Sequence, residues 1–251
     1  MKENRLDLVL VPVALSVVIG YHLWLLCTII RHPTRTVVGL NAIARKRWAA
    51  AIMADPEKNA ILAVQTLRNN IMASTVLATT AITLVSLISV FMGATTNSSP
   101  LTSASMLIYG NKTHLLSSVK YFAISLCFIS AFVCNVQAIR YYAHTSFLLG
   151  IPSLKNSLHE DKKEEGDEGH KTNEFVEYVS MGLNRGSHFW SLGLRAFYLS
   201  FTLFLWMFGP IPMVTFSVIM CFCLYFLDTT TEHSRLLHGP RDLDKALSEI
   251  V

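Results

Sequence analysis

The chain has 251 residues, of which 52% are hydrophobic and 15% are charged, and its formal net charge is +4. Its mean hydropathy of +0.42 implies more apolar surface than one soluble core can bury, which excludes an ordinary soluble globular domain. All five cysteines fall inside uncharged runs, where neither a disulfide framework nor a zinc cluster is expected. We therefore expect a membrane protein with no metal site and no cofactor.

Four long runs without a formal charge predict four membrane-spanning helices. A hydrocarbon core about 30 Å thick requires about 20 apolar residues in a helix, and each run can supply one such span. We expect the spans at residues 8–30, 71–91, 121–139 and 196–227. The predicted fold is an all-α integral membrane bundle of four helices in a single membrane domain, with a long second helix extending into the cytoplasm and short interfacial helices.

Basic residues in the connections predict the orientation, because Lys and Arg resist translocation. The connections at 31–70 and 140–195 each carry seven of them, whereas the connection at 92–120 carries two. We therefore expect the first and third connections in the cytoplasm and both termini on the opposite side. Two N-glycosylation sequons, at Asn97 and Asn111, fall in the second connection and agree with this orientation.

His22 is the one clear ionisable residue inside the first span, which makes it a functional candidate, although a neutral imidazole can also simply hydrogen-bond within a bundle. After that span, residues 37–53 predict a short helix in which Arg45-Lys46-Arg47-Trp48 places cations beside an indole. This pairing suits the membrane interface, either as a positive-inside anchor or as a contact to anionic lipid headgroups.

Asp55-Pro56-Glu57 is typical of a helix start, and one helix of about 37 residues is predicted from there through the second span. Polar residues at the cytoplasmic entries of the second and third spans predict a polar cluster, because unpaired polar groups are unfavourable in hydrocarbon. The cluster either locks the bundle or forms a mouth in which Arg68 binds an anion or a lipid headgroup. Its members are Gln65, Arg68, Asn69, Asn70, Asn135, Gln137 and Arg140.

Hydroxyl side chains recur at helical spacing along one face of the second span, where they favour either close helix packing or a water path. The fourth run contains Gly209-Pro210-Ile211-Pro212, which removes backbone donors and leaves carbonyls such as that of Trp206 without their usual partners. A break of this kind is either a structural kink or part of a transport site. The candidate intramembrane path comprises His22, Thr75, Thr79, Thr83, Ser86 and Pro210.

Residues 153–173 are strongly charged and lack apolar periodicity, so we expect a disordered cytoplasmic linker there. A short amphipathic helix is predicted next, from Thr172 or Asn173 to Leu183. Residues 184–186 then predict a turn, and Ser187 can cap the last helix. Residues 229–251 are expected to form a C-terminal tail.

Four stretches are specific enough to indicate a family: Tyr21-His22-Leu23-Trp24, Ala63 to Thr75, Arg195-Ala196-Phe197-Tyr198, and Phe204 to Pro210. Over roughly residues 5–228 the chain resembles the plant-type family of membrane proteins of unknown function numbered 599. The resemblance implies a plant origin and a four-span fold, and it implies no activity.

The sequence contains none of the common nucleotide-binding, hydrolase or metalloprotease motifs and no paired carboxylates within a span, so we do not expect an enzyme. The expected function is that of a non-enzymatic structural or partner-binding membrane component that forms a homo-oligomer. Its expected partners are membrane lipids, including anionic headgroups, or a protein, and not nucleic acid. The alternative is an oligomeric channel or carrier for a small ion or solute. The expected location is the plasma membrane or an endomembrane.

Overall fold

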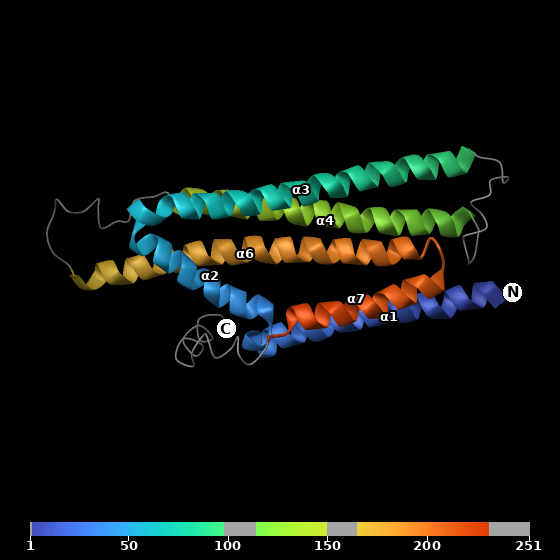
Figure 1. Ribbon diagram of the computed structural model, residues 1–251, viewed down its shortest axis with the longest axis horizontal. Helices are drawn as coiled ribbons and strands as arrows, with labels where there is room; N and C mark the ends of the chain where they lie inside the picture. Colours follow the sequence, from blue (N-terminus) through green and yellow to red (C-terminus); the bar gives the residue numbers. More distant parts are fainter. Residues whose placement is uncertain (1, 98–113, 150–164, 231–251) are drawn as a thin grey trace. The chain divides into compact units, whose positions relative to one another are not determined.

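The structure is a computed structural model that describes residues 2–97, 114–149 and 165–230 (Figure 1). These residues are almost entirely helical, and the one β-bridge among them joins Thr36 and Thr229. The elements in chain order are α1 (Lys2–Arg31), the short 3-10 helix η1 (Pro33–Arg35), α2 (Val37–Ala54), α3 (Pro56–Asn97), α4 (His114–Leu149), α6 (Glu165–Leu205) and α7 (Pro210–Asp228).

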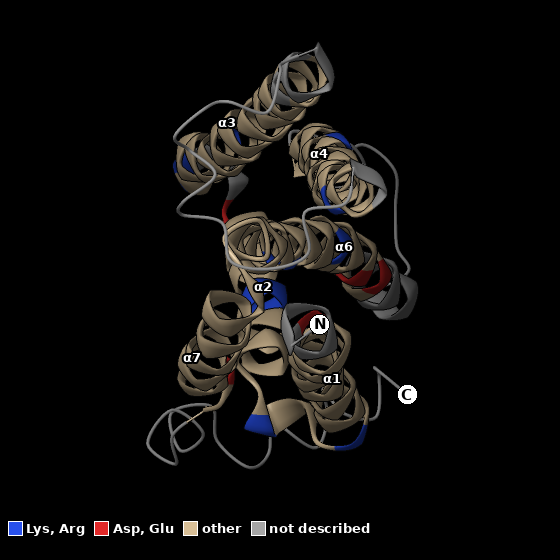
Figure 2. Cartoon of the chain, turned by 90° about the vertical axis from the view of Figure 1, so that its right-hand side faces the viewer, with Lys and Arg blue, Asp and Glu red and all other residues tan. Residues whose placement is uncertain are grey.

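Four helices in the described part of the chain are long and apolar enough to cross a membrane. They contribute the segments Asp7–Arg31, Lys58–Val90, Leu116–Leu149 and Pro210–Asp228. Lys, Arg, Asp and Glu are correspondingly sparse along the helical ribbons (Figure 2). The predicted all-α fold is therefore confirmed, with four helices that could span a membrane.

The first connection contains the two helices that its sequence predicts. The short helix is α2, and the long helix is α3, which has 42 residues. Asp55 caps α3, because its Oδ1 accepts a hydrogen bond from the backbone N–H of Lys58 at 3.4 Å. The cap and Pro56 together explain why the chain changes helix at this point.

The fourth uncharged run is two helices instead of one. α6 ends at Leu205 and α7 begins at Pro210, so the boundaries 196–227 do not describe a single span. Gly209 has a φ of 151°, a conformation that side-chain-bearing residues rarely adopt, and Pro210 then starts the next helix. The Gly-Pro pair therefore separates two helices. One expectation had been a kink within a single helix.

The carbonyl that the Gly-Pro break leaves free finds a partner within the protein. Lys120 of α4 donates a hydrogen bond from Nζ to the carbonyl oxygen of Trp206 at 3.0 Å, and the same ammonium lies 5.0 Å from the centre of the Trp206 indole. Lys120 is 4% exposed. A hydrogen bond and a cation–π contact thus hold this cation at the connection between α6 and α7.

The chain forms two compact units. Unit 1 contains Met1–Leu40, Thr80–Ala131 and Leu194–Val251, and unit 2 contains Asn41–Thr79 and Phe132–Gly193. Helices α3, α4 and α6 each contribute one part to unit 1 and the other part to unit 2.

Unit 1 is organised by the pairing of α1 with α7. Val18 packs with Met220 and Leu224, and the rings of Trp24 and Tyr225 lie 5.6 Å apart. Since later residues of α1 meet later residues of α7, the two helices run parallel, side by side (Figure 1).

The end of α6 runs antiparallel to α7 within the same unit. Arg195 contacts Asp228 and, seven residues further along α6, Thr202 contacts Met220. As the chain advances along α6, its partners on α7 move back towards the start of that helix. The connection at residues 206–209 therefore reverses the chain direction.

Unit 2 is held by a core shared among α2, α3, α4 and α6. Its buried side chains are Ala49, Ile52, Ala63, Leu67, Ala138, Tyr142, Leu149, Val179 and Leu183. The turn predicted at residues 184–186 is absent, because α6 continues through it. Gly186 instead allows close packing: a Cβ atom there would lie 2.9 Å from Cε1 of Tyr142.

The linker expected at residues 153–173 is only partly within the described residues. α6 begins at Glu165, so residues 165–173 belong to a helix, and residues 150–164 lie outside the described residues. The sequence at the start of α6 is rich in Asp and Glu, which suits the first turns of a helix because the helix dipole favours acidic residues there.

Candidate functional site

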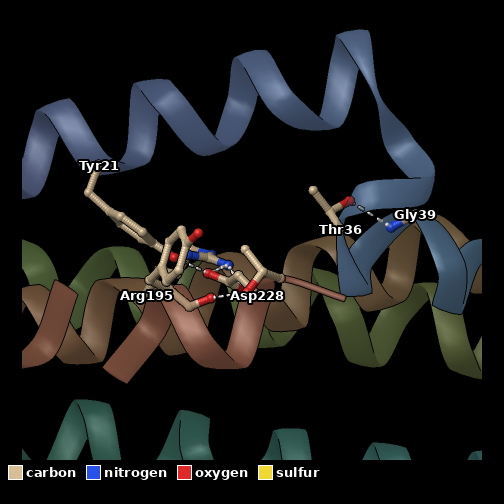
Figure 3. Close-up of polar contacts among 7 residues, drawn as sticks. Tyr21, Thr36, Gly39, Arg195 and Asp228 are labelled. Carbon is tan, nitrogen blue, oxygen red and sulfur yellow. Dashed lines mark hydrogen bonds and ion pairs between the residues drawn. The ribbon is translucent and has the colours of Figure 1, made fainter. Parts of the chain in front are cut away.

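Three helices of unit 1 meet at a polar centre formed by Tyr21 of α1, Arg195 of α6 and Asp228 of α7 (Figure 3). The Nη2 of Arg195 donates to both carboxylate oxygens of Asp228, at 2.8 and 2.9 Å. The hydroxyl of Tyr21 donates to Oδ2 of Asp228 at 2.6 Å. One carboxylate therefore joins the first helix of the chain to the last two.

Burial makes this polar centre sensitive to any loss of charge balance. The side chains of Arg195 and Asp228 are 14% and 12% exposed. An ion pair with so little water is stabilising only while both charges and their hydrogen bonds are present. Because the charges of Arg195 and Asp228 are opposite, the pair as a whole adds no net charge to offset cations nearby.

A second set of contacts fixes the segment between α1 and α2 to the end of α7. The backbone N–H of Thr230 donates to the carbonyl of Arg35 at 3.2 Å, and the Thr230 hydroxyl donates to the carbonyl of Thr34 at 3.1 Å. Thr36 is fully buried, and its Oγ1 accepts a hydrogen bond from the N–H of Gly39 at 3.3 Å (Figure 3). These contacts hold η1, and with it the backbone of Arg35, in one place.

The ends of α1 and α7 and the segment η1 line an open cavity of about 590 Å³ in unit 1, here named the α1–α7 cavity. Three basic side chains, those of Arg31, His32 and Arg35, line it, and Trp24 and Tyr225 form an aromatic wall. Cys27, Thr28, Thr229 and Thr230 complete the lining. None of the described residues that line it is acidic.

Unit 2 contains a smaller cavity of about 350 Å³, here named the Arg45 cavity. It is lined by residues of α2, α3, α4 and α6, among them Arg45, Trp48, Asn70, Tyr142 and Trp190. Each cavity lies within one unit.

The residues of the predicted polar cluster do not form one buried group. Asn135 is fully buried, whereas Gln65, Arg68, Asn69 and Arg140 are exposed. Asn70 lines the Arg45 cavity, where Arg45 supplies the cation that the sequence suggested for Arg68. The locking and mouth functions of the cluster remain predictions.

The residues of the predicted intramembrane path are also separate. Thr75, Thr79 and Ser86 are exposed on α3, and each hydroxyl donates to a carbonyl of its own helix three or four residues earlier. Thr83 is exposed on the same face. The hydroxyl stripe therefore faces away from the core of this chain.

The other two members of that path belong to the α1–α7 region. Nδ1 of His22 lies 2.7 Å from the carbonyl oxygen of Val18, one turn earlier in α1, so a local hydrogen bond satisfies this ring nitrogen. Pro210 is the first residue of α7. Of the two sequons, Asn97 is the last residue of α3, and Asn111 lies outside the described residues.

Sequence reasoning missed the polar centre because neither Arg195 nor Asp228 was among the candidate site residues. The available signal was one Arg and one Asp flanking a long uncharged run, since opposite charges near hydrocarbon tend to pair. Arg31 and Arg35 entered the reasoning only as counts for orientation. Their grouping in one cavity depends on the tertiary contact between Thr36 and Thr229.

Comparison with known proteins gives one match. Residues 9–233 match a family model described as "Protein of unknown function, DUF599". No curated protein and no solved structure matches the chain. Since the matched segment covers most of the chain, the protein belongs to this family of unknown function.

Proposed function

We propose that the protein is a non-enzymatic membrane component that binds an anionic phospholipid headgroup in the α1–α7 cavity. The observation that supports this most directly is the lining: three basic side chains, and no acidic one among the described residues, gather at the end of two spans. The nearby Asp228 is already neutralised by Arg195, so it does not compensate these cations.

The depth of the cavity fits a lipid headgroup. The apolar segments of α1 and α7 end at Arg31 and Asp228, and the two helices run parallel, so both reach the same membrane surface there. Trp and Tyr side chains favour the level of the lipid headgroups. Trp24 and Tyr225, which line the cavity, therefore fit this position.

Two guanidinium groups around one cavity favour a phosphomonoester over a headgroup with a single negative charge. Arg binds phosphate oxygens through paired N–H donors, and each charged hydrogen bond is stronger than a neutral one. A second phosphate charge would be stabilised by the second arginine. Phosphatidic acid is the simplest lipid with such a headgroup.

The test is binding of dioctanoyl phosphatidic acid to the purified full-length protein in phosphatidylcholine nanodiscs, measured by native mass spectrometry. We expect Arg31→Gln with Arg35→Gln to weaken binding by about tenfold or more, because each lost charge-assisted contact is worth about 1.5 kcal/mol or more. The matched control is Arg140→Gln with Arg185→Gln, which removes two exposed arginines outside the cavity. Equal affinity of the two double variants would contradict the proposal, as would equal binding of dioctanoyl phosphatidylcholine.

Self-association and binding of a protein partner belong to the same proposal. The exposed hydroxyl stripe of α3 supports them, because small hydroxyl side chains let membrane helices approach closely. A channel or carrier would need several copies, since the stripe faces outward in one chain. That alternative gains no further support from the cavities, each of which lies inside one unit.

A further inference from the structure

The Arg45 cavity in unit 2 has a composition different from that of the α1–α7 cavity. It contains one cation, Arg45, and its walls carry the indoles of Trp48 and Trp190 and the phenol ring of Tyr142. Neutral polar groups complete it, from Asn41, Thr66, Asn70 and Ser187, together with the apolar Leu67, Ala73 and Leu183. None of these lining residues is acidic, so nothing in the described lining offsets the guanidinium charge.

The guanidinium is positioned by a contact that leaves part of it available. Nε of Arg45 donates to Oδ1 of Asn184 on α6 at 2.7 Å. An amide oxygen orients the guanidinium without neutralising it, and the terminal nitrogens still carry donors that match the two oxygens of a carboxylate. Burial lowers the pKa of Arg45 from its usual value, as expected for a cation removed from water.

The walls of the cavity are rigid. Tyr142 is buried, and its ring lies directly over Gly186, where any side chain would clash. Trp48 and Trp190 pack against the core of unit 2. Rigid aromatic walls around a pre-oriented charged group reduce the entropy lost when a ligand is ordered, and this combination is typical of small-molecule sites.

We propose that the Arg45 cavity binds a small organic carboxylate with a flat, apolar body, with its carboxylate on Arg45 and its body between the indoles of Trp48 and Trp190. A single guanidinium favours one negative charge over the two of a phosphomonoester. The volume of about 350 Å³ is at the lower end of the range for ligand pockets, so the ligand is small. This site is separate from the lipid site proposed for unit 1.

The experiment uses two probes, 2-naphthoate and 2-naphthalenemethanol. They share the naphthalene ring, and only the first carries a negative charge. Binding to the full-length protein in phosphatidylcholine nanodiscs is measured by isothermal titration calorimetry and by quenching of tryptophan fluorescence, and protein-free nanodiscs correct for partitioning. We expect wild-type protein to bind 2-naphthoate at least tenfold more tightly than the alcohol. Arg45→Gln should abolish that difference, whereas Arg47→Gln, on the same helix but outside the cavity, should preserve it.

A second variant keeps the test decisive if Arg45→Gln fails to fold. Ala73→Leu places a larger side chain at the cavity lining without touching the charge, and we expect it to weaken binding of 2-naphthoate. Arg31→Gln with Arg35→Gln should leave 2-naphthoate binding unchanged, which separates this site from the lipid site. The inference is overturned if wild-type protein binds the two probes equally or not at all at millimolar concentration, or if both Arg45→Gln and Ala73→Leu bind 2-naphthoate like wild type.

Discussion

At the scale of single residues, Asp228 is the most consequential side chain in the described structure. It accepts hydrogen bonds from Tyr21 and Arg195, which belong to different helices. A buried ion pair contributes little net stability compared with apolar residues, yet removal of one partner leaves an uncompensated charge. The polar centre therefore constrains how the three helices pack together more than it adds to the free energy of folding.

We predict that Asp228→Asn lowers the stability of the protein by about 3 kcal/mol, because Arg195 would keep its charge in a site with little water. Thermal unfolding followed by fluorescence-detected size exclusion measures the change. The control is Lys58→Gln, which breaks the exposed ion pair between Lys58 and Asp55. The Lys58 side chain is 84% exposed and the Asp55 side chain is 49% exposed. Exposed pairs contribute about 0–1 kcal/mol, so a shift in the control as large as in Asp228→Asn would refute the buried-charge explanation.

At the scale of helices, the close approach of α4 and α6 in unit 2 depends on glycine. A Cβ atom at Gly186 would lie 2.9 to 3.2 Å from three ring carbons of Tyr142, and one at Gly182 would lie 2.7 Å from Oγ1 of Thr145. Both contacts are closer than a side chain tolerates. Glycine in α6 is therefore a packing requirement, where sequence reasoning expected a turn.

We predict that Gly186→Ala destabilises the protein by about 1–3 kcal/mol, the usual range for overpacking, because the buried Tyr142 ring must move. Gly20→Ala is the matched control, since no atom lies within 4 Å of its added Cβ and alanine favours the helix by up to about 1 kcal/mol. Both melting temperatures are measured in the same detergent. If the two variants melt alike, Gly186 has no packing function.

Local signals predicted the elements far better than they predicted the contacts. Asp55 and Pro56 define the start of α3 by themselves, because capping and proline geometry act within a few residues. The Gly209-Pro210 break was also visible, but whether the chain kinks or reverses depends on what α7 packs against. Arg45 and Asn184 are 139 residues apart, so the Arg45 cavity was not accessible to reasoning from spacing.

At the scale of the whole molecule, helix directions within unit 1 constrain the number of membrane crossings. Successive crossings alternate in direction, so the first and the fourth of four would run antiparallel. α1 and α7 run parallel instead, and α6 runs antiparallel to α7. An additional crossing by α6 reconciles these directions, and Arg195 is the sole charged residue from Gly186 to Gly209.

We therefore predict that the two termini lie on opposite sides of the membrane, with the N-terminus extracytoplasmic and the C-terminal tail in the cytoplasm. The expectation of two extracytoplasmic termini assigned a single crossing to residues 196–227. Protease protection of epitope tags at each end, in sealed microsomes, measures the two locations. If both tags are protected, the expectation from the sequence stands and the fifth crossing is wrong.

The position of Asp228 in the chain also bears on how the protein is made. Arg195 is synthesised 33 residues before its carboxylate partner and Tyr21 207 residues before it. At about 5–20 residues per second, Arg195 waits a few seconds and α1 waits about 10–40 s for α7 to be made. Unit 1 therefore cannot complete its packing while its first helices are being synthesised. Arg195 of α6 has no carboxylate partner until α7, which carries Asp228, has been made. With α6 as an additional crossing, we expect α6 and α7 to insert as a pair, because neither charge is then left alone in lipid.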